Sequence, residues 1–134
     1  MDYFAQFPEF SIREGEHLRN AFIRLARSRG WQEEGRSRER AQFHQQVMHD
    51  INAQFDKLEH LQDLCRRLFD QEPGTITQCQ KLLCTKYINI WDVVERKDKY
   101  FDSFKDFRNY TKRGRTFDRR AAKGLRLNVF LRKL

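Results

Sequence analysis

The residues best suited to bind a ligand are a block of basic side chains near the carboxyl end of the chain. Residues 105–134 hold eleven Lys or Arg and two acids, a formal charge of +9. Residues 1–104 hold sixteen basic and seventeen acidic side chains, a formal charge of −1. The net charge of +8 is therefore a local property. Such a block attracts phosphate, an anionic membrane surface or an acidic protein patch.

The spacing of these residues predicts one cationic helix face. On a helix that begins near Asp118, Arg119, Lys123 and Arg126 recur at i, i+4 and i+7 and share a face. Arginine dominates the block, and its planar guanidinium matches phosphate with two parallel hydrogen bonds. Nucleic-acid contacts through phosphates are therefore expected from eight residues: Arg108, Lys112, Arg113, Arg115, Arg119, Arg120, Lys123 and Arg126.

The same block has two plainer interpretations. One is an ordinary solvated face, whose Lys and Arg stems cover apolar surface. The other is a nuclear import signal, since Lys112-Arg113-Gly114-Arg115 is followed by Arg119-Arg120. The slightly acidic residues 1–104 offer no second nucleic-acid surface. This leaves open a protein-interaction adaptor whose basic tail meets an acidic partner.

The amino-terminal residues 3–10 are rich in aromatic side chains. Pro8 favours an extended conformation at Phe7, which predicts an extended arm rather than a helix. Docking of this arm on the protein's own core is the favoured interpretation. The alternative is a protein-partner site formed by Phe4, Phe7 and Phe10, because large exposed apolar patches mark interfaces.

Neither a metal site nor a catalytic site is predicted. Cys65, Cys79 and Cys84 lack the close cysteine pairs of a zinc site, and buried thiols explain them better. Their odd number favours an intracellular protein with reduced cysteines. No nucleophile motif and no glycine-rich phosphate loop is present. We therefore expect no enzyme activity, no catalytic residue and no cofactor.

Scarce glycine and proline argue against an all-β chain with many tight turns. Apolar periodicity instead predicts helices over 13–28, 37–55, 57–69, from Thr75, over 88–95, around 104–110 and over 118–132. A polar linker is expected at 32–39, and a charged connector at 97–102. Thr75 and Gln78 suit a capping box. No apolar run is long enough to cross a bilayer, so no membrane partner is expected.

The order of several short motifs resembles a family of small fungal helical proteins. The motifs are Phe7-Pro8-Glu9-Phe10, Arg29-Gly30-Trp31, Leu64-Cys65, Thr75-Ile76-Thr77-Gln78-Cys79 and Ile88-Asn89-Ile90-Trp91-Asp92-Val93-Val94. This chain differs by having His60 and Leu61 where such proteins often carry a tryptophan. The resemblance implies a compact helical domain with no settled activity, so it supplies no catalytic residues.

Together these observations predict an all-α protein. The expected fold is a single compact bundle of six or seven short helices over residues 1–134, with an extended aromatic arm at 1–12 and a basic helical segment at 105–134. The expected function is that of a non-enzymatic, intracellular and nuclear binding module that contacts DNA or RNA. The alternative is an adaptor subunit of a larger complex.

Overall fold

The computed structural model describes residues 2–117 and confirms the all-α class. The basic residues expected beyond Phe117 lie outside this range. The elements in chain order are η1 (Asp2–Gln6), α1 (Leu18–Arg29), α2 (Glu33–Gln54), α3 (Leu58–Phe69), α4 (Ile76–Leu83), α5 (Ile90–Val94) and α6 (Phe104–Lys112). Within these residues the one β feature is an isolated antiparallel bridge between Tyr87 and Phe101.

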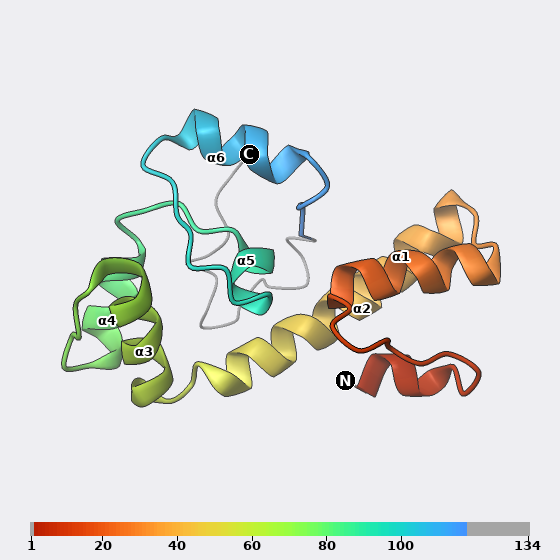
Figure 1. The fold of residues 1–134 in the computed structure, drawn as a ribbon, viewed down its shortest axis with the longest axis horizontal. Coiled ribbons are helices and arrows are strands. Elements are labelled where there is room, and N and C mark those ends of the chain that lie inside the picture. Colours follow the sequence, from red (N-terminus) through yellow and green to blue (C-terminus); the bar gives the residue numbers. More distant parts are fainter. Residues whose placement is uncertain (1, 118–134) are drawn as a thin grey trace.

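The long helix α2 organises the molecule. It carries η1 and α1 near its amino-terminal half, while the α3–α4 pair lies beyond its carboxyl end (Figure 1). The short helix α5 lies between these two ends, and α6 lies on the far side of α5 from α2 (Figure 1). No helix in the described part of the chain is long and apolar enough to cross a membrane.

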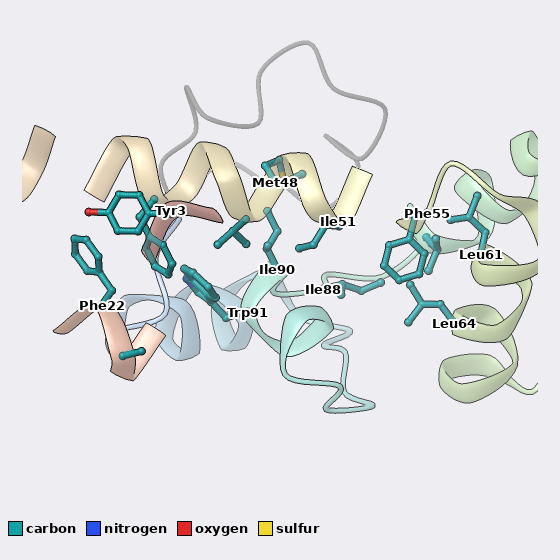
Figure 2. Close-up of a cluster of buried hydrophobic side chains, with 14 of the residues drawn as sticks. Tyr3, Phe22, Met48, Ile51, Phe55, Leu61, Leu64, Ile88, Ile90 and Trp91 are labelled. Carbon is teal, nitrogen blue, oxygen red and sulfur yellow. The ribbon is translucent and has the colours of Figure 1, made fainter. Parts of the chain in front are cut away.

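A continuous buried cluster joins these helices along α2. Met48 and Ile51 of α2 lie beside Ile90 of α5, and the cluster continues to Phe55 and Leu61 at the start of α3 (Figure 2). At the other end, aromatic rings from η1, α1, α2 and α5 pack together. Burial of such large side chains stabilises the fold by about 1.5–3 kcal/mol for each one fully buried.

Several predicted helix ends are confirmed by their hydrogen bonds. Thr75 caps α4, where its hydroxyl accepts a hydrogen bond from the backbone N–H of Gln78 at 3.1 Å. Asn89 caps α5, where its side-chain oxygen accepts a hydrogen bond from the backbone N–H of Trp91 at 2.9 Å. The apolar segment that follows is therefore a helix, as predicted, and not a strand. Gly30 ends α1 at φ +65°, a left-handed conformation that glycine adopts without strain.

Two predicted boundaries are wrong by about a turn. The first helix begins at Leu18 and not at Arg13, because a local turn precedes it. In this turn Glu16 accepts hydrogen bonds from the N–H of Arg13 and from the guanidinium of Arg24. The second helix begins at Glu33, so most of the expected linker 32–39 is helical. Two acidic residues in its first turn favour a helix start there.

The amino-terminal arm is not extended throughout, which corrects that prediction. Residues 2–6 form the short 3-10 helix η1, and the Gln6 amide donates a hydrogen bond to the Tyr3 carbonyl. Tyr3 is buried and donates its hydroxyl to Glu39 of α2 at 2.9 Å. Desolvation by burial, together with this bond, raises the pKa of Tyr3 far above its usual value. The arm thus docks on its own core, as the favoured interpretation predicts.

The α3–α4 pair encloses two of the three cysteines. Cys65 and Cys79 are fully buried and form no disulfide, whereas Cys84 is exposed. Burial raises the pKa of the Cys65 thiol to about 12. The predicted burial of the thiols is therefore confirmed for Cys65 and Cys79 and is wrong for Cys84, which follows the last residue of α4 and is exposed.

Candidate anion-binding pocket

A basic pocket of about 450 Å³ lies between α1 and α2. Four arginines line it: Arg19 and Arg27 from α1, and Arg36 and Arg40 from α2. No described residue that lines the pocket carries a carboxylate. The pocket therefore concentrates positive charge in a concave space, where it is screened less than on an open surface.

On both α1 and α2, residues that line the pocket recur every four positions along the helix. Arg19, Ile23 and Arg27 recur every four residues on α1 and share one helix face. On α2, Arg36 and Arg40 are followed at the same spacing by His44. Because the helices pack together through Phe22 and Phe43, these two rows meet at one pocket.

Three aromatic rings form the buried floor of the pocket. Phe22 and Phe43 stack at 4.8 Å between ring centroids, and Trp91 stacks on Phe43 at 6.0 Å. All three are at most 5% exposed. Little of these rings is therefore accessible to a ligand, and their packing fixes the positions of α1, α2 and α5 around the pocket.

The arginines of the pocket differ in their partners. Arg19 donates to Glu95 at 3.3 Å and to the Gly114 carbonyl at 2.9 Å. Arg27, Arg36 and Arg40 form no ion pair with any other residue between 2 and 117. Three guanidinium charges in one pocket thus lack a counter-charge from the described chain.

Two buried donors of the pocket arginines have no acceptor. The Nε atoms of Arg19 and Arg36 are shielded from solvent and make no hydrogen bond within the described residues. Leaving a buried donor of a charged group unsatisfied costs free energy. Both residues line the pocket, so an oxygen-rich anion there offers acceptors to their guanidinium groups.

The segment after α6 closes one side of the pocket. Trp91 donates its indole N–H to the Thr116 carbonyl at 2.9 Å, and Asn89 donates to the Arg115 carbonyl at 3.1 Å. Gly114 and Thr116 line the pocket as a result. Phe117 then stacks on His44 at 4.5 Å. The basic carboxyl-terminal sequence therefore leaves the described fold directly beside the pocket.

Arg115 belongs to a buried charge network and not to the exposed basic surface. Its guanidinium lies 2.9 Å from Asp92 and 3.3 Å from Glu95, whose side chains are each 1% exposed. Tyr110 donates its hydroxyl to Asp92 at 2.7 Å. Burial and this bond raise the pKa of Tyr110 to about 12.

Glu95 is held ionised at the centre of this network. Burial alone would raise its pKa, yet Arg19, His17 and Arg115 together bring the pKa below its ordinary value of 4.5. Lys97 adds a further ion pair at 3.5 Å. Glu95 therefore ties α1 and the segment after α6 to the end of α5.

The remaining sequence-predicted site residues lie in three settings. Arg108, Lys112 and Arg113 are exposed on or just after α6. Arg119, Arg120, Lys123 and Arg126 lie outside the described residues. For the alternative partner site, Phe4 is buried, while Phe7 and Phe10 are half-buried against the core. Their rings contact Trp31 and Phe4 respectively, so they do not form an exposed apolar patch.

Sequence reasoning did not find the pocket arginines. Arg19 and Arg27 lie on an amphipathic helix, and the charged side of such a helix is expected to face solvent. Arg36 lies in the segment expected to be a linker. The four-residue spacing of Arg36, Arg40 and His44 could have indicated a shared helix face, but only for a helix that begins before Arg36.

Comparison with known protein families, curated proteins and solved structures finds no match to this chain. The resemblance to the fungal family stays a prediction.

Proposed function

We propose that this protein is a non-enzymatic nucleic-acid-binding module that contacts phosphates mainly through arginine. The observation that carries the proposal is the pocket in which Arg27, Arg36 and Arg40 lack ion-pair partners among the described residues. Like charges held close together repel, and a bound polyanion relieves this repulsion. Guanidinium groups also match phosphate oxygens in geometry.

A second basic surface lies on α6 and extends the footprint. Lys105, Arg108 and Lys112 recur at i, i+3 and i+7, are exposed, and form no ion pair within residues 2–117. Arg113 is exposed beside them, and the chain from there to Thr116 leads to the pocket. A strand of several nucleotides carries a phosphate at each step along its backbone, so one strand offers contacts to both surfaces.

This mode of binding is weakly sequence-specific. Phosphate contacts position a protein on nucleic acid but carry no base information. In the described part of the chain, the aromatic rings nearest the pocket are buried, so base stacking on them does not supply specificity. The proposal therefore covers DNA and RNA alike, with binding that weakens as salt concentration rises.

A nuclear location goes with this proposal. The basic sequence that also resembles an import signal is only partly accessible, because Arg115 pairs with Asp92 and Glu95. Lys112 and Arg113 are exposed. Imaging a fluorescent fusion of the parent and of a Lys112→Gln/Arg113→Gln variant tests the location. A uniformly cytoplasmic parent would contradict it.

The binding experiment measures affinity for duplex DNA and for single-stranded RNA over a salt series. For duplex DNA the slope of log affinity against log salt is about 0.9 per neutralised phosphate. Changing Arg108 and Lys112 to Gln should weaken binding and reduce this slope. Changing Arg119, Arg120 and Lys123 to Gln tests the sequence beyond Phe117 in the same way.

The matched control removes two charges from the other end of the molecule. Lys57 and Lys81 are exposed on the α3–α4 pair, away from α6 and the pocket. Their double change to Gln should leave the affinity and the slope near those of the parent. Absence of parent binding to either nucleic acid at physiological salt rejects the proposed function.

The adaptor alternative is favoured by one observation. Ile23 lines the basic pocket and is 44% exposed, which provides an apolar contact beside positive charge. An acidic peptide with an apolar residue would suit such a surface. If an acidic control polymer binds as tightly as nucleic acid at equal charge, the adaptor function replaces the first proposal.

A further inference from the structure

We propose that the arginine pocket holds a terminal phosphate monoester, the dianionic end of a nucleic-acid strand. This inference rests on the proposed function and assigns a specific role to the pocket. Phosphates within a strand would then contact α6, while the phosphorylated end would enter between α1 and α2.

The charge of the pocket favours a monoester over a diester. Because Glu95 pairs with Arg19, three guanidinium groups remain without a counter-charge from the described residues. A phosphodiester carries one negative charge and has two unesterified oxygens. A monoester carries about −1.5 to −2 at neutral pH and offers three strong acceptor oxygens. The monoester therefore balances the three positive charges more closely than a diester does.

The donors come from two walls and converge on the same space. Arg36 and Arg40 lie one turn apart on α2, and Arg27 belongs to the facing row on α1. The shielded Nε of Arg36 still needs an acceptor. Three oxygens around one phosphorus can accept hydrogen bonds from arginines on both helices at once. A diester has only two free oxygens, and its two ester bonds occupy the other positions around the phosphorus.

The shape of the pocket also favours a strand end. The buried floor of Phe22, Phe43 and Trp91 closes it from below, and Gly114 and Thr116 bound one side. A continuous backbone must enter and leave a site, whereas a terminal phosphate only has to enter. Ile23 at the exposed side offers apolar contact to the sugar or base of the terminal nucleotide.

The test compares one short single-stranded oligonucleotide with a 5′-phosphate, with a 3′-phosphate, or with hydroxyl groups at both ends. A terminal phosphate at one end or both should improve the affinity of the parent protein about tenfold, as expected for added hydrogen bonds to a charged group. Inorganic phosphate at millimolar concentration should reduce this preference and leave binding of the hydroxyl form nearly unchanged.

The variants are a matched pair on one helix. Arg40→Gln removes a pocket charge, and Arg38→Gln removes an exposed charge two residues away that does not line the pocket. We expect Arg40→Gln to abolish most of the preference and Arg38→Gln to retain it. Circular dichroism and urea unfolding of both variants establish that each remains folded.

The outcomes separate this inference from the proposed function. Equal binding of the phosphorylated and hydroxyl forms, with salt-dependent affinity intact, overturns the terminal-phosphate site but leaves nucleic-acid binding standing. Failure of every oligonucleotide to bind rejects both. A phosphoserine peptide that binds the parent more tightly than the phosphorylated oligonucleotides overturns the inference and assigns the pocket to a protein ligand. Equal loss of preference in Arg38→Gln and Arg40→Gln also overturns it.

Discussion

Two groups of arginines lie close to one another in this protein and have opposite roles. Arg115 and Arg19 are paired with Asp92 and Glu95 around the end of α5. Arg27, Arg36 and Arg40 line the neighbouring pocket and have no such partners among residues 2–117. The first group holds elements together, and the second is available to a ligand.

The difference shows why a count of charges does not locate a binding site. Arg115 belongs to the basic block, yet its charge is already balanced by two buried carboxylates. Arg36 and Arg40 belong to the nearly neutral part of the chain, where Glu33, Glu34 and Glu39 offset them in the sequence. In space, none of these glutamates lines the pocket. Local pairing, rather than net charge, thus identifies the available cations.

The largest effect on stability is expected from Arg115→Ala, which tests whether the paired arginines are structural. It removes the arginine that pairs with buried Asp92 and one of the cations that pair with buried Glu95. Removing one member of a buried pair costs about 3–5 kcal/mol. Since Arg19 and Lys97 still reach Glu95, we expect a loss near the lower end, about 3 kcal/mol. Urea unfolding measures it.

The control for that variant is Arg113→Ala, which removes an exposed arginine two residues earlier. Exposed substitutions shift stability by about 0.5 kcal/mol or less. If both variants have the same stability, Arg115 is no more structural than its exposed neighbour, and the contrast between the two groups fails.

A smaller effect is expected from Tyr110→Phe. The change removes the hydroxyl that donates to Asp92 but keeps the ring on which the Arg115 guanidinium lies, 5.0 Å from the ring centroid. A hydrogen bond to a charged group contributes about 1.5–3 kcal/mol. Because Arg115 also bonds the same carboxylate oxygen, we expect a loss of about 1.5 kcal/mol in thermal or urea unfolding. An unchanged unfolding curve would show that water replaces this bond without cost.

The pH dependence of stability tests whether the paired arginines act through the charge of Glu95. Glu95 has a pKa below its ordinary 4.5 in the folded protein, so it stabilises the fold above that pH and ceases to do so as pH falls through the lower folded value. Glu95→Gln should therefore be less stable than the parent at neutral pH. The gap between the two should narrow as pH falls below 4.5.

Urea midpoints collected from neutral to acidic pH measure this gap. Glu9→Gln, at an exposed position in the amino-terminal arm, is the control and should follow the parent throughout. A gap that stays constant with pH would show that Glu95 contributes through its shape rather than through its charge.

The smallest effect, of opposite sign, is expected in the pocket. Arg36 and Arg40 are like charges at i and i+4, an arrangement that destabilises a helix by a few tenths of a kcal/mol. Arg40→Gln should therefore raise the free energy of unfolding by about 0.3 kcal/mol in low salt, and less in high salt. A loss of 1 kcal/mol or more would place Arg40 among the structural arginines and remove the basis of the proposed site.

Much of the secondary structure was predictable because it depends on neighbours within a few residues. The four-residue recurrence of Phe43, Val47 and Ile51 predicts a buried helix face, and the cap at Thr75 follows from its own hydroxyl. The two wrong helix starts, at Arg13 and in the 32–39 segment, share one cause. There the start of a helix depends on a turn or on first-turn acids that apolar periodicity does not report.

Local sequence patterns are enough to predict that the chain is helical, where most of its helices lie, and that its basic charge is concentrated near one end. Which arginines are paired with a carboxylate follows from contacts between residues that are distant in the sequence. Arg19 meets Glu95 across 76 residues, and Arg115 meets Asp92 across 23. Such pairs form because packing of Trp91 against Phe43 brings α5 to α1 and α2. Helical periodicity is a local property, whereas the balance of charge at a site depends on long-range packing.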